Sequence, residues 1–368
     1  MLYKDRLETL YAFQYGIGNV NPNNGGQYPV YGSNGIIGYY DKYNSEDSPV
    51  VGHIGANAGI VVFGKGKHYV TYNGVICKAK SGVNSRYAYY TLLNANPKKL
   101  TRGSTQPFIS YDILNAIPIL KHEFKDQIKI GNILAALDDK IELNNKVNQE
   151  LEKTAKDLYN YWFVQFDFPD GNKRPYKSSG GKMVYNDVLK REIPEGWTMD
   201  TLGNICNLYQ PETISEKDCD PNGKYYVYGS NGIIGRYNKK NHNDSEIVIS
   251  CRGDCGNIIR TMPNVWITGN AMVVHPKSNV SQEFIYFALQ NAGIKRIITG
   301  SVQGQITRKN LEPVKIVMPP LSLLEQYEQL VCDNVNTRIQ NDIETELLQK
   351  LRDFLLPMLM NGQVSVSD

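Results

Sequence analysis

The sequence predicts a mixed α/β (α+β) protein, in which two tandem domains of one fold are combined with a pair of long antiparallel helices. Three observations lead to this prediction. The stretch YPVYGSNGIIG at residues 28–38 returns as YYVYGSNGIIG at residues 225–235. Short β-branched and aromatic runs separated by glycine and asparagine follow each copy, which is typical of strands and turns. Each half then ends in a long segment with apolar residues at helical spacing.

The repeat keeps one register at an offset of 197 residues. Beyond the repeated stretch, identical residues face each other in the pairs Asp47 and Asp244, Gly59 and Gly256, Thr71 and Thr268, Asn73 and Asn270, Gly103 and Gly300, Ser104 and Ser301, Gln106 and Gln303, and Leu114 and Leu311. A period of this length is too long for a solenoid or a propeller blade. Each copy is therefore expected to be a domain with its own core, related to the other by a pseudo-twofold axis.

Within each copy the elements follow the same order. Strands are predicted in the first copy in the runs PVVGHIG, GIVVFG and YVTYNGVICKA. A helix is predicted at residues 86–94, with its counterpart at 283–290. A Gly-Ser-x-Gln turn then leads into a short apolar strand, at residues 116–120 and 314–320.

The segments after these strands predict two long amphipathic helices. The first, at about 123–163, contains no proline, and its apolar stripe runs through residues 130, 134, 137, 141, 147, 151, 155, 158 and 162. The second, at 322–358, opens on a capping box of Ser322 and Glu325. Its stripe is Tyr327, Val331, Val335, Ile339, Ile343, Leu347, Leu351, Phe354 and Met358. Single-stripe helices are not stable alone in water, so an antiparallel coiled-coil pair is predicted; the alternative is that each helix packs only on its own domain.

The predicted organisation has six parts. They are a first domain at 1–119, a long helix at 120–165, a linker rich in Pro, Gly, Lys and Ser at 166–195, a second domain at 196–319, a second long helix at 320–361 and a tail at 362–368.

Charge is distributed unevenly along the chain. The net charge is only +3, but residues 24–113 hold nine Lys and Arg against four Asp and Glu, and residues 221–310 hold eleven against four. Basic duplicated domains suit a polyanionic partner, although ordinary solvated surfaces remain an alternative. The N-terminal MLYKDRLETLYAF lacks the apolar run of a signal peptide, and no stretch is apolar enough to span a bilayer, so a cytoplasmic protein is expected.

The sequence carries no motif for catalysis. It lacks a G-x-x-x-x-G-K-[ST] loop, a G-x-G-x-x-G string and an Asn-Pro-Pro-aromatic string. The six cysteines form no C-x-x-C pair, and the five histidines are scattered. We therefore expect no catalytic residue and no metal site, and a function in recognition.

The candidate recognition residues lie in the predicted loops. Ser33 and Asn34, with Ser230 and Asn231, belong to the repeated stretch, which forms either a ligand loop or the tight turn of a hairpin. Side-chain amides can bond adenine edges, hydroxyls can bond phosphate, and basic residues can neutralise phosphate. We expect Gln106 and Gln303 to bond adenine edges, and Ser104 and Ser301 to bind phosphate. The basic residues expected to neutralise phosphate are Arg102, Arg296, Arg308 and Lys309.

Base specificity is expected where the copies disagree, at 53–57 against 250–254 and at 107–112 against 304–309. Arg252 could read guanine as a bidentate donor, which its counterpart at an offset of 197, Gly55, cannot do. The other candidates from these segments are His53, Asn57, Tyr111, Asp254 and Gln305.

Several longer strings carry a family resemblance. They are VMPPLSLLEQ at 317–326, LLPMLMNGQVSV at 355–366, the linker FPDGNKRPYKSSGGKMVYN and EIPEGWTMDTLGNI at 192–205. With them, the chain resembles the specificity (S) subunit of type I restriction-modification systems over its whole length. The first domain departs from the pattern because it has no Pro-x-Gly-Trp lead-in, so its N-terminal strand or helix is expected to be shortened.

The resemblance implies a non-catalytic subunit of a phage-defence complex. Two target-recognition domains would read unlike halves of a bipartite site in double-stranded DNA, and the paired helices would dock two modification (methyltransferase) subunits and a restriction subunit. S-adenosylmethionine, ATP and Mg would be bound by those partners, with no cofactor in this chain. Two other readings are a tandem carbohydrate- or protein-binding module and a twin-domain nuclease-methyltransferase; the second would need a cofactor loop that the sequence lacks.

Overall fold

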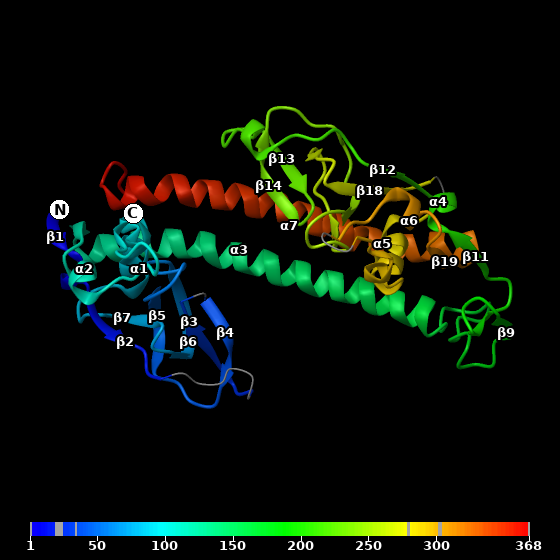
Figure 1. The fold of residues 1–368 in the computed structure, drawn as a ribbon. Helices are drawn as coiled ribbons and strands as arrows, with labels where there is room; N and C mark the ends of the chain where they lie inside the picture. Colours follow the sequence, from blue (N-terminus) through cyan, green and yellow to red (C-terminus); the bar gives the residue numbers. More distant parts are fainter. Residues whose placement is uncertain (1, 19–24, 34, 278–279, 301–303, 367–368) are drawn as a thin grey trace. The chain divides into compact units, whose positions relative to one another are not determined.

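The protein is described from a computed structural model that covers residues 2–18, 25–33, 35–277, 280–300 and 304–366. The chain forms two units, each of mixed α/β structure (Figure 1). Unit 1 comprises Met1–Asn144 together with Glu344–Asp368, and unit 2 comprises Asn145–Ile343. Unit 1 is thus assembled from the two ends of the chain.

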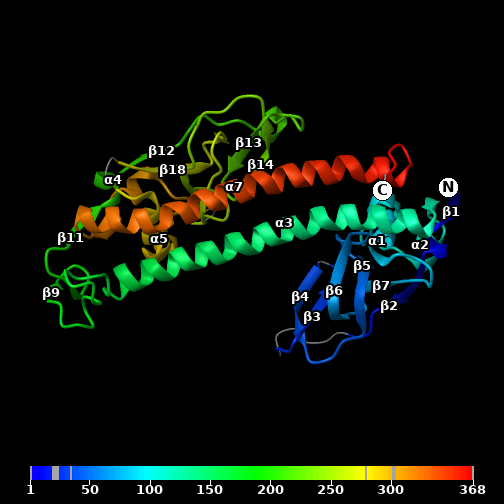
Figure 2. The same cartoon turned by 180° about the vertical axis from the view of Figure 1, so that it is seen from behind.

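Unit 1 is built on a six-stranded sheet of order β2-β7-β5-β6-β3-β4, beside a two-stranded sheet of β1 and β8. Its elements are β1 (Leu2–Arg6), η1 (Leu7–Thr9), β2 (Tyr11–Tyr15), β3 (Tyr28–Gly32), β4 (Gly35–Tyr40), β5 (Ser45–Gly52), β6 (Val61–Val70), β7 (Gly74–Ala79), α1 (Ser85–Ala95), η3 (Pro97–Leu100), α2 (Tyr111–Asn115) and β8 (Pro118–His122). The helix α1 packs on the sheet. Both views show α3 on the side of α1 that faces away from the sheet (Figure 2).

Unit 2 repeats this topology. Its elements are β9 (Met183–Asn186), β10 (Arg191–Pro194), β11 (Thr198–Thr201), α4 (Leu202–Ile205), β12 (Cys206–Tyr209), η5 (Glu216–Asp218), β13 (Tyr225–Gly229), β14 (Gly232–Tyr237), β15 (Ile247–Ser250), β16 (Ile258–Arg260), β17 (Trp266–Ile267), β18 (Ala271–Pro276), α5 (Gln282–Asn291), η6 (Ile294–Ile297), α6 (Arg308–Leu311) and β19 (Lys315–Met318). The sheets have the orders β12-β18-β15-β16, β14-β13-β17 and β11-β19, and β9 pairs with β10.

The single sheet of unit 1 becomes two sheets in unit 2 because one strand is interrupted. The long strand β6 corresponds to β16 and β17 together. Pro263 lies in the interruption and has no N–H to donate to a ladder. Asn264 follows with φ of 57°, which no strand residue adopts. The parallel pairing survives on the far side of the break, since Val227 pairs with Trp266 as Val30 pairs with Tyr69.

The short helices form where the sequence predicts them. Asn84 caps α1 by accepting a hydrogen bond from the Tyr87 N–H at 2.9 Å, and Ser281 caps α5 in the same way for Phe284 at 3.1 Å. Such caps satisfy backbone donors that the first turn of a helix leaves free. Each helix buries an aromatic face in the core of its unit.

The first domain has a complete lead-in strand, contrary to the expectation of a shortened one. Strand β1 pairs antiparallel with β8 from Leu2 opposite His122 to Arg6 opposite Pro118. The strand β11, which follows the Gly-Trp lead-in of unit 2, pairs with β19 in the equivalent place. A different sequence therefore fills the same role in unit 1.

The two long helices are α3 (Phe124–Tyr159), which continues into a π-helical turn (Asn160–Val164), and α7 (Leu321–Met360). The predicted capping box at the start of α7 is wrong. The Leu324 N–H donates to the Pro320 carbonyl at 3.3 Å, so Pro320 occupies the cap position and Ser322 already lies within the first turn.

Segments of both long helices pair antiparallel inside each unit. In unit 1, the Asn144 side-chain amide donates to Glu344 at 2.8 Å, and Arg352 binds Asp138 at 2.9 Å. In unit 2, Asn148 donates to Asp342 at 2.7 Å, Arg338 binds Glu152 at 3.3 Å and the Tyr327 hydroxyl donates to the Ala155 carbonyl at 3.2 Å. The partner number rises as the α3 number falls in both units, which confirms the predicted antiparallel pair.

The long helices also belong to the cores of the units. In unit 1, Ile130 and Leu134 of α3 and Leu356, Leu359 and Met360 of α7 are buried with α1 and the sheet. In unit 2, residues near the end of α3 and the start of α7 are buried with α5 in the same way. The helices therefore pack both on each other and on the domains, so the two alternatives weighed from the sequence hold together.

The predicted apolar stripe of α7 is correct at its start and wrong toward its end. Tyr327 and Val331 are fully buried, but the side chains of Leu347, Leu351 and Phe354 are 61%, 45% and 59% exposed. A stripe of steps of four residues drifts around an α-helix by about 40° per step, because each residue advances about 100°. Over several steps the stripe leaves the buried face.

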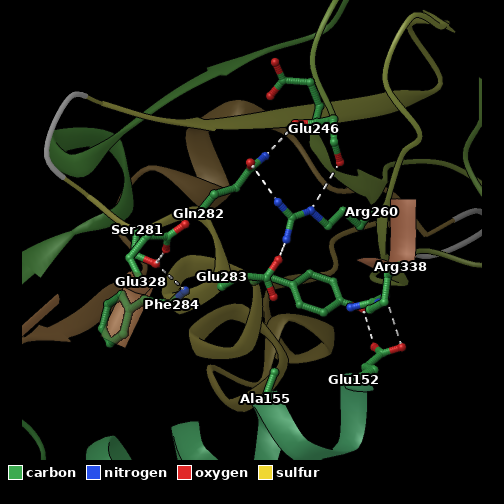
Figure 3. A network of polar contacts seen from close by, with 12 residues as sticks. Glu152, Ala155, Glu246, Arg260, Ser281, Gln282, Glu283, Phe284, Glu328 and Arg338 are labelled. Atoms are coloured by element: carbon green, nitrogen blue, oxygen red, sulfur yellow. Dashed lines mark hydrogen bonds and ion pairs between the residues drawn. The ribbon is translucent and has the colours of Figure 1, made fainter. Parts of the chain in front are cut away.

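A buried ion pair anchors the sheet of unit 2 to α5 (Figure 3). Arg260 at the end of β16 pairs with Glu283 in the first turn of α5, and their side chains are 12% and 1% exposed. Arg260 also donates to Ser245 at 3.2 Å and to Gln282 at 3.0 Å. Burial lowers the pKa of Arg260 to about 10, so its guanidinium stays charged at neutral pH.

A second group of polar contacts continues from α5 to both long helices in unit 2. The Tyr286 hydroxyl of α5 donates to Glu152 of α3 at 3.0 Å, and Glu152 in turn accepts from Arg338 of α7. Burial, together with the Glu152 carboxylate, raises the pKa of Tyr286 to about 12, so the hydroxyl keeps its proton. The α/β fold and the helix segments of unit 2 are therefore joined by directional contacts as well as by apolar packing.

Acid is expected to destabilise unit 1 through His68. This side chain in β6 is fully buried, with Nδ1 2.9 Å from the Gly66 carbonyl, and burial lowers its pKa. The unfolded chain then binds more protons than the folded one below about pH 6.5, so stability falls as the pH falls through that value. The melting temperature measured by calorimetry should fall between about pH 7.5 and about pH 5.5, and it should fall less for His68→Gln than for the wild type. An equal fall in both proteins would contradict this role.

Candidate nucleic-acid interface

The repeated stretch forms the same tight hairpin turn in both units. In unit 1, β3 and β4 close on the pair Gly32 and Gly35, and in unit 2, β13 and β14 close on Gly229 and Gly232. A register shift lies at the equivalent place in both hairpins. Gly35 and Gly232 have φ of 76° and 118°, which favours glycine. Of the alternatives weighed from the sequence, the geometry favours the turn.

Loops of unit 1 gather at one end of its sheet, and we call residues 33, 53–59, 71–74 and 102–110 the first loop cluster. The His53 N–H donates to the Asn73 carbonyl at 2.8 Å, and the His53 carbonyl accepts from the Ile109 N–H at 2.9 Å. The Gly55 N–H donates to Pro107 at 2.8 Å. A Cβ on Gly52 would lie 3.0 Å from the Ser33 carbonyl, which brings the hairpin turn into the cluster.

Unit 2 holds the equivalent second loop cluster, which consists of residues 230–231, 250–257, 268–270 and 304–307. The Ile306 N–H donates to the Cys251 carbonyl at 3.0 Å. The Asn257 side-chain amide donates to Asn231 at 3.0 Å and to Asp254 at 2.9 Å. Loops that are far apart in the sequence therefore form one surface in this unit as well.

The hydrogen bonds change the alignment of the two clusters by one residue. The His53 carbonyl accepts from the Ile109 N–H, and the Cys251 carbonyl accepts from the Ile306 N–H. Because Ile109 and Ile306 correspond at the offset of 197, His53 and Cys251 occupy the same place. Isolated bridges then pair Ile54 with Phe108 in unit 1 and Arg252 with Gln305 in unit 2. The counterpart of Arg252 is therefore Ile54, and the sequence alignment with Gly55 is wrong.

The first cluster brings most of its candidate residues together. Arg102, Ser104 and Gln106 are exposed in the loop that the Arg102–Phe108 bridge closes. His53, Asn57 and Ser33 are partly buried, and Asn34 lies outside the described residues.

Tyr111 opens α2 beside this loop and takes part in an aromatic stack that the sequence did not reveal. Its ring stacks on Tyr15 at 4.0 Å, and Tyr15 lies 4.5 Å from the His53 ring. Burial raises the pKa of Tyr15 and of Tyr111, so both hydroxyls stay protonated. No sequence signal joined these residues, because Tyr15 precedes the repeated stretch.

The candidates of unit 2 are more scattered. Arg252, Asp254, Asn231 and Gln305 are exposed in the second cluster, and Ser230 is partly buried. Arg296 lies in η6, while Arg308 and Lys309 lie in α6, where Arg308 pairs with Glu312 at 2.8 Å. Ser301 and Gln303 lie outside the described residues.

The neighbouring cysteines of the second cluster are buried thiols. Burial raises the pKa of Cys251 to about 11 and also raises the pKa of Cys255. A protonated thiol is a poor nucleophile and a poor metal ligand. Among the residues that the structure describes, no group of three or more His, Cys, Asp and Glu side chains could hold a metal ion, and no helix is long and apolar enough to cross a membrane.

Both units thus carry a loop cluster of this kind on an α/β fold, with different side chains in each. The chain belongs to the family described as the type I restriction modification DNA specificity domain, whose sequence model matches residues 17–153 and 194–352. Its function is therefore DNA target recognition in a type I restriction-modification system.

Individual relatives agree with this assignment. The type I restriction enzyme MjaIX specificity subunit of Methanocaldococcus jannaschii is 29% identical, over 78% of this chain and 71% of its own. The HindI specificity subunit of Haemophilus influenzae is 23% identical, over 72% of each chain. The crystal structure of the type I S subunit from M. genitalium shares the fold, with a TM-score of 0.66, 19% identity and coverage of 98% of this chain and 96% of that one.

Proposed function

We propose that the chain reads a bipartite, asymmetric site in double-stranded DNA, with each loop cluster contacting one half-site. The observation that carries the proposal is the pair of loop clusters, which share backbone hydrogen bonds and differ in side chains. The shared backbone hydrogen bonds would place both clusters against DNA in a similar way, while the different side chains would select different bases. The basic excess of both domain segments favours phosphate contacts as well.

We further propose that the long helices dock two modification (methyltransferase) subunits and a restriction subunit. Apolar side chains of the helices that are exposed in this chain support a docking role, since such surfaces are typical of protein interfaces. They include Leu143 on α3 and Leu330, Leu347, Leu351 and Phe354 on α7. Under this proposal S-adenosylmethionine, ATP and Mg are bound by the partner subunits, which carry out methylation and cleavage.

Mapping methylated adenines tests the proposal. The chain would be co-expressed with its modification subunit in a host without other methyltransferases. We expect methylation within a split motif whose two halves differ and are separated by a gap of unread bases. A continuous or palindromic motif would contradict the assignment of one half-site to each cluster. The tandem carbohydrate- or protein-binding module considered from the sequence is not favoured, because the family match covers both repeats.

The unread gap is expected to depend on the length of the helix pair. Deleting residues 141–147 and 341–347 together removes a matched segment from both antiparallel helices. Seven residues span about 10 Å of helix, and a deletion of seven nearly preserves the facing of the remaining side chains. The methylated motif should keep its half-sites while the gap shortens by about three base pairs. The same deletion in α3 alone should abolish methylation, and an unchanged gap in the double deletion would refute this role.

A further inference from the structure

One isolated β-bridge occupies the same place in both loop clusters, but its side chains are apolar in unit 1 and polar in unit 2. In unit 1 it joins Ile54 to Phe108, and in unit 2 it joins Arg252 to Gln305. The equivalence does not depend on sequence alignment alone. The bridge begins at the residue after His53 in unit 1 and at the residue after Cys251 in unit 2. A second bridge joins Phe108 to Arg102 in unit 1 and Gln305 to Thr299 in unit 2.

The bridge of unit 1 presents an apolar surface. The Phe108 side chain is 38% exposed although it is a large aromatic group. Two further exposed apolar side chains, Ile17 and Tyr72, lie near this end of the sheet, where the Tyr72 N–H donates to the Gly18 carbonyl at 3.2 Å. An apolar group that is exposed at a recognition surface can be buried against a ligand.

The bridge of unit 2 presents hydrogen-bonding groups. Arg252 and Gln305 are both exposed. Within the part of the chain that the structure describes, the Arg252 guanidinium makes no hydrogen bond or ion pair. The nearby carboxylate of Asp254 is held by Asn257 at 2.9 Å. The guanidinium is thus available to a ligand.

The edges of bases distinguish these two surfaces. Guanine offers the paired acceptors O6 and N7 in the major groove, which match the fork of an arginine side chain. Thymine offers a methyl group there, which packs on apolar side chains. The same backbone position would therefore select different bases in the two half-sites.

We infer that Arg252 reads a guanine in the half-site of the second domain, and that Ile54 and Phe108 pack on a thymine methyl group at the equivalent position of the other half-site. This inference rests on the proposed bipartite reading and adds the bases that the bridge selects. The matched control is Arg296, an exposed arginine of the same unit that lies in η6 and takes no part in the bridge.

The first experiment compares adenine methylation maps of the full chain and its variants, each co-expressed with the modification subunit. Arg252→Ala should relax one guanine position of one half-site by about five- to hundredfold, and leave the other half-site unchanged. Arg296→Ala should lower methylation at all sites without changing the motif. If Arg252→Ala behaves like Arg296→Ala, Arg252 contacts phosphate and the inference is overturned.

The second experiment removes single atoms from the DNA. With purified complex, 7-deazaguanine at the assigned position should lower the methylation rate for the wild type and not for Arg252→Ala. Deoxyuridine in place of the assigned thymine lacks only the methyl group, and should lower the wild-type rate about fourfold but leave Phe108→Ala unaffected. Equal effects on wild type and variant would overturn the assignment of that base.

The outcomes separate this inference from the proposed function. A split methylated motif whose second half contains no guanine that depends on Arg252 would refute the inference alone. The absence of any split motif for the wild type would refute the proposed function. Tryptophan fluorescence during urea unfolding shows whether Arg252→Ala keeps a folded unit 2, and a second substitution, Arg252→Lys, retains charge while losing the bidentate fork. Arg252→Lys should also relax the guanine preference.

Discussion

Glu283→Ala is expected to lower the free energy of unfolding of unit 2 by about 3–5 kcal/mol. The Glu283 side chain is 1% exposed and neutralises Arg260, which is itself 12% exposed. Removing the carboxylate leaves a buried guanidinium without its charge partner. Urea unfolding followed by tryptophan fluorescence isolates this effect, since Trp162, Trp197 and Trp266 are the three tryptophans of the chain and all lie in unit 2.

Two control variants separate the loss of charge pairing from other effects. Glu195→Ala breaks the exposed Lys182–Glu195 pair of the same unit, whose side chains are 71% and 52% exposed, and should change the stability little because water screens the pair. Replacing both partners, with Arg260→Met and Glu283→Leu, should restore much of the stability, because apolar side chains can fill a buried ion-pair site. A cost for Glu283→Ala no greater than that of Glu195→Ala would contradict the buried pair.

The second large effect is expected at Tyr327, where Tyr327→Ala should destabilise unit 2 by about 3–5 kcal/mol. The side chain is fully buried where α7 meets the end of α3. Its ring lies 5.0 Å from the Phe163 ring in an edge-on geometry and 6.1 Å from Trp162. Truncation removes these ring contacts and leaves a cavity between the helices.

Tyr327→Phe is the matched control, because it keeps the ring and removes only the hydroxyl that bonds the Ala155 carbonyl. It should cost about 1 kcal/mol in the same urea experiment. The alanine variant should also lose methylation of the split motif at temperatures where the phenylalanine variant keeps it. Similar stabilities for the two variants would show that packing of the ring contributes little to the helix pair.

The fold could be predicted from the sequence because the repeat supplied the same information twice. Glycines and apolar runs at a constant offset predicted two α/β domains, and unbroken amphipathic segments predicted the long helices. Three features could not be predicted. The drift of the α7 stripe depends on which helix face packs against the rest of the protein. The cap at Pro320 depends on where the preceding strand β19 ends. The lead-in strand β1 has no sequence likeness to β11.

The sequence located the loops of the two clusters but not the contacts within them. The divergent segments 53–57 and 250–254 lie in the loop clusters, whereas 107–112 and 304–309 begin there and continue into α2 and α6. The repeated turn has the same geometry in both units. The correspondence of Arg252 with Ile54 could not be predicted, because unit 2 has one residue more before β15 and one fewer in the loop after it. The offset of 197 therefore holds on both sides of this segment and fails within it. Side-chain partners across such loops are set by tertiary hydrogen bonds, which a linear comparison does not contain.

The discontinuity of unit 1 has a consequence for how the protein is made. Its sheet and α1 are synthesised before unit 2, yet Leu356, Leu359 and Met360, which contribute to their core, are synthesised after it. Unit 2 is continuous in the chain and has all its segments available earlier. The core of unit 1 is therefore completed only after unit 2 has been synthesised, and the apolar surface that α7 covers stays exposed until then.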